Sequence, residues 1–263
     1  MKIGIIIPNY NNEKWLDKCL TSIVNQTYKN YEVIFIDDMS TDNSVNIAYN
    51  YVEKLTDMQI VELKQKRYNG GARNEGYLYL SDDVDYVYYI DSDDWLYDEN
   101  ALKSINEALI DKPDVLFVGI AKYQNNITTK ESLPTYDSKY KAIQGWSGSC
   151  GKVIKKELAT KQECLYNEGT LKEDKNQHFK ICIYMNSFKC LNKLIYVYNL
   201  CNATSTTKVR DKITWGTSTI RHYADTLQLA LSVKGKDKKI DEILQERLIK
   251  CKNEMLNNGD KQY

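Results

Sequence analysis

Carboxylates gather in two short stretches of the sequence, each directly after an apolar run. Asp37-Asp38 follows Tyr31–Ile36, and Asp91-Ser92-Asp93-Asp94 follows Tyr86–Ile90. An Asp-x-Asp segment in extended conformation places two carboxylates on one side of the chain, where both can ligate Mg²⁺ or Mn²⁺ through oxygen. The same acids can instead cap the following helix or form a turn. The residue types therefore indicate either a divalent-cation site, of the kind that holds a diphosphate, or an acidic turn.

A third polar stretch, Pro8–Asn12, follows the apolar run Ile3–Ile7. In an open parallel sheet, ligands bind beyond the carboxyl ends of the strands. If all three stretches end neighbouring strands, their five carboxylates repel one another unless a cation or hydrogen-bond donors compensate. We therefore expect a metal, a polar ligand or both at this edge.

The first half of the chain alternates apolar runs with helical periodicity, which predicts a mostly parallel α/β sheet. Continuous apolar runs are typical of parallel strands that are covered on both faces. The expected strands are Lys2–Ile7, Tyr31–Ile36, Met58–Leu63, Tyr86–Ile90 and Asp114–Ala121, and the expected helices are Glu13–Val24, Asn43–Leu55, Gly70–Leu80 and Glu99–Ile110.

The second half is less regular. Residues 122–151 are polar and predict a hairpin or a loop. A helix over Leu171–Phe188 and a strand over Leu194–Tyr198 follow, and two closing helices are expected over Thr217–Val233 and Ile240–Met255. Because there is no repeat and no long linker, one continuous domain with a C-terminal helical extension is expected.

Composition narrows the function classes. The 263 residues contain 36 Lys and Arg and 36 Asp and Glu, so the net charge of zero gives no strong nucleic-acid signal. No apolar window is long enough to span a membrane and no signal-peptide pattern is present, which predicts a cytoplasmic protein. Seven Cys without a C-x-x-C pair and only two His argue against a zinc finger or a disulfide framework and favour reduced, buried thiols.

Four motifs occur in order: I-I-P-N-Y-N (Ile6–Asn11), Gln26–Ser44 with its I-D-D, N-G-G-A-R-N-E-G (Asn69–Gly76) and Y-I-D-S-D-D-W-L (Tyr89–Leu96). Together they closely resemble the family 2 glycosyltransferases of the GT-A fold. The resemblance implies a Rossmann-like, mostly parallel sheet flanked by helices. It also implies a GT-A domain over residues 1–215, with a nucleotide-sugar-binding half (1–121) and an acceptor-binding half (122–215), followed by a helical extension (216–263).

The resemblance also assigns the donor site. In similar enzymes, the loop after the first strand and the second Asp of I-D-D hold the uridine, the Asp-x-Asp residues hold ribose and metal, the next Asp closes the pocket, and the Arg-Asn pair lies beside the nucleotide. By this resemblance, the uridine contacts here are Pro8, Tyr10 and Asp38. The ribose and metal residues are Asp91 and Asp93, with Asp93 as metal ligand, and the residue that closes the pocket is Asp94. The pair beside the nucleotide is Arg73 and Asn74.

The catalytic base is expected from the second half. Glu173-Asp174 resembles the E-D motif of the family, in which the Asp takes the acceptor proton, so Asp174 is the expected base, and Glu173 or His178 would be considered only in its place. His178 could contact the acceptor or the metal, but a structural or exposed histidine is favoured. Ser205–Arg210 resembles a segment that closes over the donor, which makes Lys208 and Arg210 candidate diphosphate contacts; a solvated loop is the alternative.

Two of the Trp residues are open to two interpretations. Trp95 and Trp146 are equally suited to walling an acceptor site against sugar C–H faces and to core packing. Trp215, ahead of the closing helices, is expected to be structural.

The resemblance implies an inverting transfer from a UDP-sugar to an acceptor hydroxyl, with Mn²⁺ or Mg²⁺, in polysaccharide or other glycoconjugate synthesis. The acceptor can be a glycan, a lipid-linked sugar or another hydroxyl. A non-catalytic nucleotide-sugar or carbohydrate-binding module and a transferase that acts on a nucleobase or a protein remain alternatives. A nucleotidyltransferase is set aside because Pro8–Asn11 is not a Gly- and Arg-rich loop. The four Lys within 234–239 leave peripheral membrane contact open.

Overall fold

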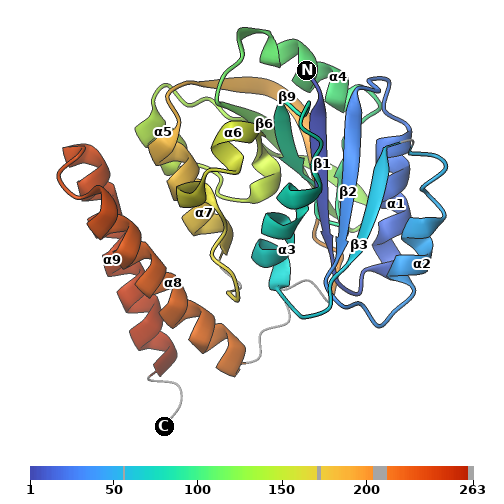
Figure 1. The fold of residues 1–263 in the computed structure, drawn as a ribbon. Helices are drawn as coiled ribbons and strands as arrows, with labels where there is room; N and C mark the ends of the chain where they lie inside the picture. Colours follow the sequence, from blue (N-terminus) through green and yellow to red (C-terminus); the bar gives the residue numbers. More distant parts are fainter. Residues whose placement is uncertain (56, 171–172, 204–211, 260–263) are drawn as a thin grey trace.

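The computed structural model describes residues 1–55, 57–170, 173–203 and 212–259. One sheet with flanking helices forms the body, and a helical hairpin lies at one side (Figure 1). The sheet has the strand order β3-β2-β1-β4-β8-β6-β9-β5, with β7 paired to β6. The strands are β1 (Ile3–Asn9), β2 (Tyr31–Asp37), β3 (Met58–Glu62), β4 (Tyr86–Tyr89), β5 (Trp95–Leu96), β6 (Val115–Gln124), β7 (Ile127–Ser132), β8 (Lys152–Lys155) and β9 (Phe188–Asn199).

The α/β architecture with flanking helices and a C-terminal helical extension is confirmed. The helices are α1 (Glu13–Val24), α2 (Ser44–Tyr49), α3 (Tyr68–Gly76), α4 (Ala101–Ala108), α5 (Lys139–Ile143), α6 (Lys156–Ala159), α7 (Glu173–Tyr184), α8 (Lys212–Val233) and α9 (Lys238–Gly259).

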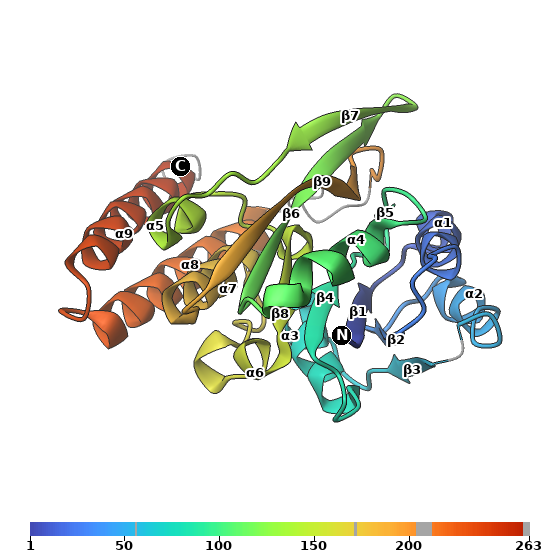
Figure 2. The ribbon, with the colours of Figure 1, turned by 90° about the horizontal axis from the view of Figure 1, so that it is seen from above.

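The sheet is mixed rather than mostly parallel throughout. Strands β3, β2, β1 and β4 are parallel, as are β6 and β9. However, β8 lies antiparallel between β4 and β6, and β5 runs antiparallel to β9. The second half of the chain therefore joins the sheet by inserting β8, instead of repeating the strand–helix–strand pattern of the first half (Figure 2).

The register brings the three polar stretches to one edge, as expected. Asn9 lies opposite Asp37 across β1 and β2, and Ile6 lies opposite Tyr89 across β1 and β4. The residues that follow these strands therefore leave the sheet side by side.

Alternate residues of the central strands fill the cores on the two faces. Ile5 and Ile7 pack with α1 and α4 residues on one face, and Ile6, with Ile34 and Ile36 of β2, packs on the other against α3 and α7 residues. Because each fully buried side chain contributes about 1.5–3 kcal/mol, both layers stabilise the sheet. This explains the uninterrupted apolar runs of β1 and β2.

Several expected boundaries differ. Helix α2 ends at Tyr49 and is followed by turns instead of continuing to Leu55. The polar segment after β6 is a hairpin: Asn125 and Asn126 both have positive φ (52° and 62°), which suits the tight turn into β7.

Strand β9 is longer than expected. Its pairing with β6 shifts register around Gly119. A Cβ at this position would lie 2.3 Å from the carbonyl oxygen of Lys193, so only glycine lets the two backbones approach this closely.

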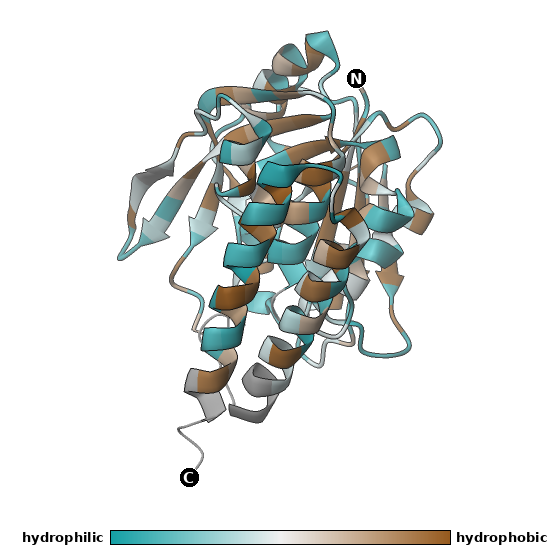
Figure 3. Ribbon diagram, turned by 90° about the vertical axis from the view of Figure 1, so that its left-hand side faces the viewer, coloured by the Kyte–Doolittle hydropathy of each residue, from teal (hydrophilic) through white to brown (hydrophobic). Residues whose placement is uncertain are grey.

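Helices α8 and α9 form the hairpin, and α8 packs against α7. Figure 3 views their outer face, where hydrophilic and hydrophobic residues alternate along both helices. None of the helices within the described residues is long and apolar enough to cross a membrane. All seven cysteines are free and five are buried, which confirms the expected thiols.

Candidate active site

A cleft of about 320 Å³ opens at the edge where β1, β2 and β4 end. Loops from both halves of the chain form its walls. Of the residues expected in the site, the following line the cleft: Pro8, Tyr10, Asp38, Arg73, Asp91, Asp93 and Asp174. Asp94 is almost fully buried and does not line it.

Arg73 connects Asp91, which follows β4, to the two acids at the start of α7. Its Nη2 donates to Oδ1 of Asp91 at 2.6 Å, and its Nη1 donates to Oδ1 of Asp174 at 3.2 Å and to Oε1 of Glu173 at 3.3 Å. Burial opposes the charge of this guanidinium, but the surrounding carboxylates outweigh burial and hold the pKa of Arg73 well above its ordinary value. Its planar, forked donors suit contact with several carboxylates at once.

Helix α3 carries Arg73 close to α7 because its first turn contains glycines. A Cβ at Gly70 would lie 3.0 Å from Cγ of Glu173 and 3.1 Å from the carbonyl oxygen of Asn167. Gly70 of the N-G-G-A-R-N motif therefore allows the close approach of the two helices.

Asp174 reaches the cleft from the first turn of α7, with 35% of its side chain exposed. Its Oδ1 accepts a hydrogen bond from the Ser149 hydroxyl, which lies 2.5 Å from the hydroxyl of Tyr166. Glu173 is buried: burial, together with the charge of the adjacent Asp174, raises its pKa to about 8 against the opposing charge of Arg73. Of the two acids, Asp174 is thus the one presented to a ligand.

Asp91 and Asp93 form a pair of carboxylates at the floor of the cleft. Burial, together with the charge of Asp91, raises the pKa of Asp93 to about 6, while a hydrogen bond of 2.7 Å from Asn202 opposes this shift. Asn202 also donates to Oδ1 of Asn12, whose amide donates to the hydroxyl of Ser92. These contacts orient the Asp-Ser-Asp turn.

The carboxylates of Asp91 and Asp93 fit a divalent cation whose remaining ligands come from outside this pair. A cation would offset the repulsion that raises the pKa of Asp93. Within the described residues, no three His, Cys, Asp or Glu side chains are grouped to hold a metal by themselves. An ion bound by one or two carboxylates and completed by phosphate oxygens and water is the arrangement that Mg²⁺ commonly adopts.

Asp94 does not line the cleft, but its hydrogen bonds hold the loop that does. Its Oδ2 accepts from the hydroxyl of Tyr196 at 2.6 Å and its Oδ1 from the backbone N–H of Asn199 at 2.7 Å. Both partners belong to β9. The carboxylate therefore fastens the Asp-rich loop to this strand.

The other end of the cleft is organised around Asp38. Its two oxygens accept the backbone N–H groups of Arg67 (2.7 Å) and Tyr68 (2.8 Å), and Lys66 Nζ lies 3.2 Å from Oδ2. The ammonium of Lys66 also lies over the ring of Tyr10, and its burial lowers its pKa. Asp38 thus holds the chain that leads into α3.

Four residues of the site were not expected from the sequence: Lys66, Ser149, Tyr166 and Asn202. None of the four lies within a residue pattern that indicates a site by itself. Ser149 is part of a G-S-C-G stretch, which suggests a tight turn and nothing more specific.

His178 does not face the cleft. Its Nε2 contacts the carbonyl oxygens of Ala142 (3.0 Å) and Ile143 (3.2 Å), and burial lowers its pKa to about 3. It is a neutral, structural histidine.

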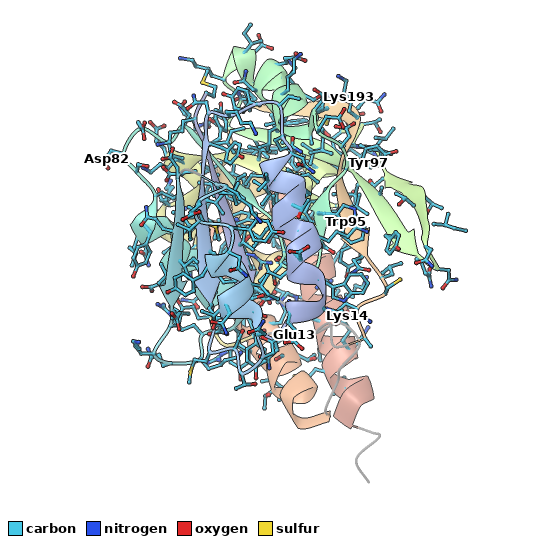
Figure 4. All side chains as sticks on the ribbon, turned by 90° about the vertical axis from the view of Figure 1, so that its right-hand side faces the viewer. Glu13, Lys14, Asp82, Trp95, Tyr97 and Lys193 are labelled. Carbon is cyan, nitrogen blue, oxygen red and sulfur yellow. The ribbon has the colours of Figure 1, made fainter. Side chains whose placement is uncertain are left out.

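The two tryptophans considered for the acceptor site lie in different places. Trp146 lines the cleft, whereas Trp95 lies beside α1 (Figure 4), packed on Tyr123 with the ammonium of Lys18 above its ring. Lys208 and Arg210 lie outside the described residues, as does the side chain of Trp215.

Comparison with known proteins agrees with this geometry. The family model "Glycosyl transferase family 2" matches residues 4–184. Glycosyltransferase GlyA of Streptococcus pneumoniae is 33% identical over 76% of this chain and 30% of its own length. The poly(ribitol-phosphate) beta-glucosyltransferase of Bacillus spizizenii is 34% identical over 44% of this chain and 18% of its own. The chain thus spans less than a third of these curated relatives.

Among solved structures, S. aureus TarS 1–349 in complex with UDP-GlcNAc superposes with a TM-score of 0.76. The superposition covers 100% of this chain and 73% of that one, at 19% sequence identity. At this identity the likeness establishes the GT-A fold.

Proposed function

The chain belongs to glycosyl transferase family 2, and from this premise we propose that it is an inverting, metal-dependent glycosyltransferase. It moves a sugar from a UDP-sugar to an acceptor hydroxyl in the synthesis of a polysaccharide or another glycoconjugate. In this proposal residues 1–121 bind the donor, residues 122–215 bind the acceptor, and residues 216–263 are a helical extension.

The observation that carries the proposal is the bridge made by Arg73 between Asp91 and Asp174. A transferase must hold a diphosphate leaving group and deprotonate an acceptor beside it. The buried guanidinium of Arg73 contacts both acids, so it fixes the distance between Asp91, beside the proposed diphosphate site, and Asp174, the proposed base.

Asp174 is the general base in this proposal. Within the described residues, the hydrogen bonds from Arg73 and Ser149 both fall on its Oδ1, which orients Oδ2 as the oxygen that accepts the proton of the acceptor hydroxyl. The deprotonated oxygen attacks the anomeric carbon and the diphosphate leaves. One displacement turns the configuration over once.

Asp93, with Asp91, is the residue that would hold Mn²⁺ or Mg²⁺. When bound, the ion neutralises charge that develops on the diphosphate. Tyr10, Pro8 and Asp38 form the nucleoside end of the cleft. UDP is the proposed nucleotide because the TarS structure of the same fold contains UDP-GlcNAc.

The direct test is hydrolysis of nucleotide-sugars by the purified protein with Mn²⁺ or with EDTA. We expect turnover of a UDP-sugar that requires the ion, and a product of inverted anomeric configuration by NMR when an acceptor is supplied. Asp93→Asn should weaken metal-dependent UDP binding, because an amide cannot replace an anionic ligand.

Two results contradict the proposal. Binding of UDP without hydrolysis or transfer of any donor favours the alternative of a non-catalytic binding module. UDP affinity that is the same in wild type, Asp93→Asn and EDTA-treated protein removes the metal assignment.

A further inference from the structure

A second depression lies along α9. A cavity of about 360 Å³ lies between residues 143–147, α7 and α9. Another, of about 240 Å³, continues between α5 and α9 and shares Gln144, Ile243 and Glu246 with the first. Figures 1 and 2 both show α5 beside α9. We call the two cavities together the α9 groove.

The groove begins next to the candidate base. Asp174 lines the cleft and the next residue, Lys175, lines the groove. The wall between them is the loop that contains Ser147, on the groove side, and Gly148, on the cleft side. Lys152, which is fully buried, holds this wall by donating to the carbonyl oxygens of Ser147 (3.2 Å) and Gly148 (2.7 Å).

The groove has an excess of positive charge, although the whole chain has a net charge of zero. Its cationic side chains are Lys141, Lys175, Lys239, Arg247 and Lys250, and its acidic ones are Glu242 and Glu246. Such a local excess attracts anions to this surface.

Lys250 presents an accessible positive charge on this surface. It is exposed and makes no ion pair with the residues described, so its ammonium is a suitable partner for phosphate oxygens. Arg247, one turn before it, adds positive charge to the groove, but its Nε is buried and has no hydrogen-bond partner in the described part of the chain, and its Nη2 lies 2.7 Å from Nε2 of His222.

Building on the transferase activity proposed above, we propose that the α9 groove binds an extended acceptor polymer linked by phosphodiesters and leads it to Asp174. The cations are distributed along both cavities, as the repeated charges of such a polymer require. A neutral polysaccharide gains nothing from this charge excess. The poly(ribitol-phosphate) transferase among the relatives acts on a polymer of this class.

The test uses the full chain and a ribitol-phosphate oligomer of defined length, titrated by calorimetry without donor. Lys250→Glu is the variant of choice because Lys250 is exposed and the helix should fold normally, which circular dichroism verifies. Lys236→Glu is the matched control: it makes the same charge change at an exposed position in the α8–α9 turn, outside the groove.

We expect the wild type to bind the oligomer more tightly than maltohexaose or inorganic phosphate, with an affinity that falls as salt rises. Lys250→Glu should weaken this binding at least about fivefold, since it removes one ion pair and adds a repulsion, and Lys236→Glu should change it less than about twofold. UDP affinity and donor hydrolysis should be unaffected in both variants.

The inference is overturned if the oligomer binds no better than maltohexaose, if inorganic phosphate binds equally well, or if the two variants weaken binding equally. Its failure is separate from that of the transferase proposal. Donor hydrolysis with no preference for the oligomer contradicts the groove alone, whereas Lys250-dependent oligomer binding without donor turnover contradicts the transferase and supports the groove.

Discussion

Arg73 faces three carboxylates within one small volume: Asp91, Glu173 and Asp174. A single positive charge cannot neutralise three negative ones. Burial relieves part of this imbalance by raising the pKa of Glu173 to about 8, so that this acid retains its proton at neutral pH. The protonation of Glu173 is thus a consequence of the same packing that positions Asp174.

This arrangement predicts how stability depends on pH. Glu173 has a folded pKa near 8 and an ordinary value of 4.5, so between these values the folded state binds a proton that the unfolded state has lost. Stability should therefore fall as pH rises through this window. Glu173→Gln stays neutral in both states, and its free energy of unfolding should fall less between pH 5 and pH 8 than that of the wild type.

Urea unfolding of both proteins at pH 5, 6.5 and 8 measures this difference. Equal slopes of stability against pH would show that Glu173 is ionised in the folded protein. Glu163→Gln, a change of the same kind at a residue without contact to Arg73, serves as the control.

At the scale of elements, β9 determines how the second half of the site is held. The strand pairs with β6 along one edge and supplies Tyr196 and Asn199, which fasten Asp94. Its backbone approaches that of β6 closely at Gly119. Neither the pairing nor the contact follows from the residue pattern of the strand, since only residues 194–198 have the apolar character that predicts it.

Gly119→Ala should accordingly destabilise the protein. The added Cβ would lie 2.3 Å from the carbonyl oxygen of Lys193, so the backbones of β6 and β9 must separate, and such overpacking typically costs about 1–3 kcal/mol. Chemical denaturation should show this loss in the free energy of unfolding.

Gly235→Ala provides a comparison, because its Cβ meets nothing within 4 Å and only its positive φ of 77° is unfavourable. It should cost about 1 kcal/mol, because a Cβ is disfavoured in the left-handed region. If Gly119→Ala cost no more than Gly235→Ala, the tight contact between β6 and β9 would not be a real constraint.

At the scale of the whole molecule, the cleft combines residues from Pro8 to Asn202. The convergence of Asp38, Asp91 and Asp93 at one edge could be predicted, because parallel strands bring their carboxyl ends together. Asp174 was predicted through the family motif.

The remaining residues could not be predicted, because their positions depend on tertiary contacts. Ser149 reaches Asp174 only after β8 has inserted between β4 and β6, and Asn202 reaches Asp93 only after β9 has paired. Lys66 depends on the path of the loop that Asp38 holds. The positions of these residues in the cleft depend on the strand order and on loop paths, which local sequence patterns do not specify.

In the proposed mechanism Asp174 takes the acceptor proton, and the rate of sugar transfer by Asp174→Asn at saturating donor tests this role most directly. Removing a positioned base typically lowers the rate by about 10²–10⁴-fold, and the amide oxygen can still accept the hydrogen bonds of Arg73 and Ser149. We therefore predict transfer slowed by at least about 100-fold with UDP affinity unchanged. Transfer within a few-fold of the wild-type rate would contradict the account.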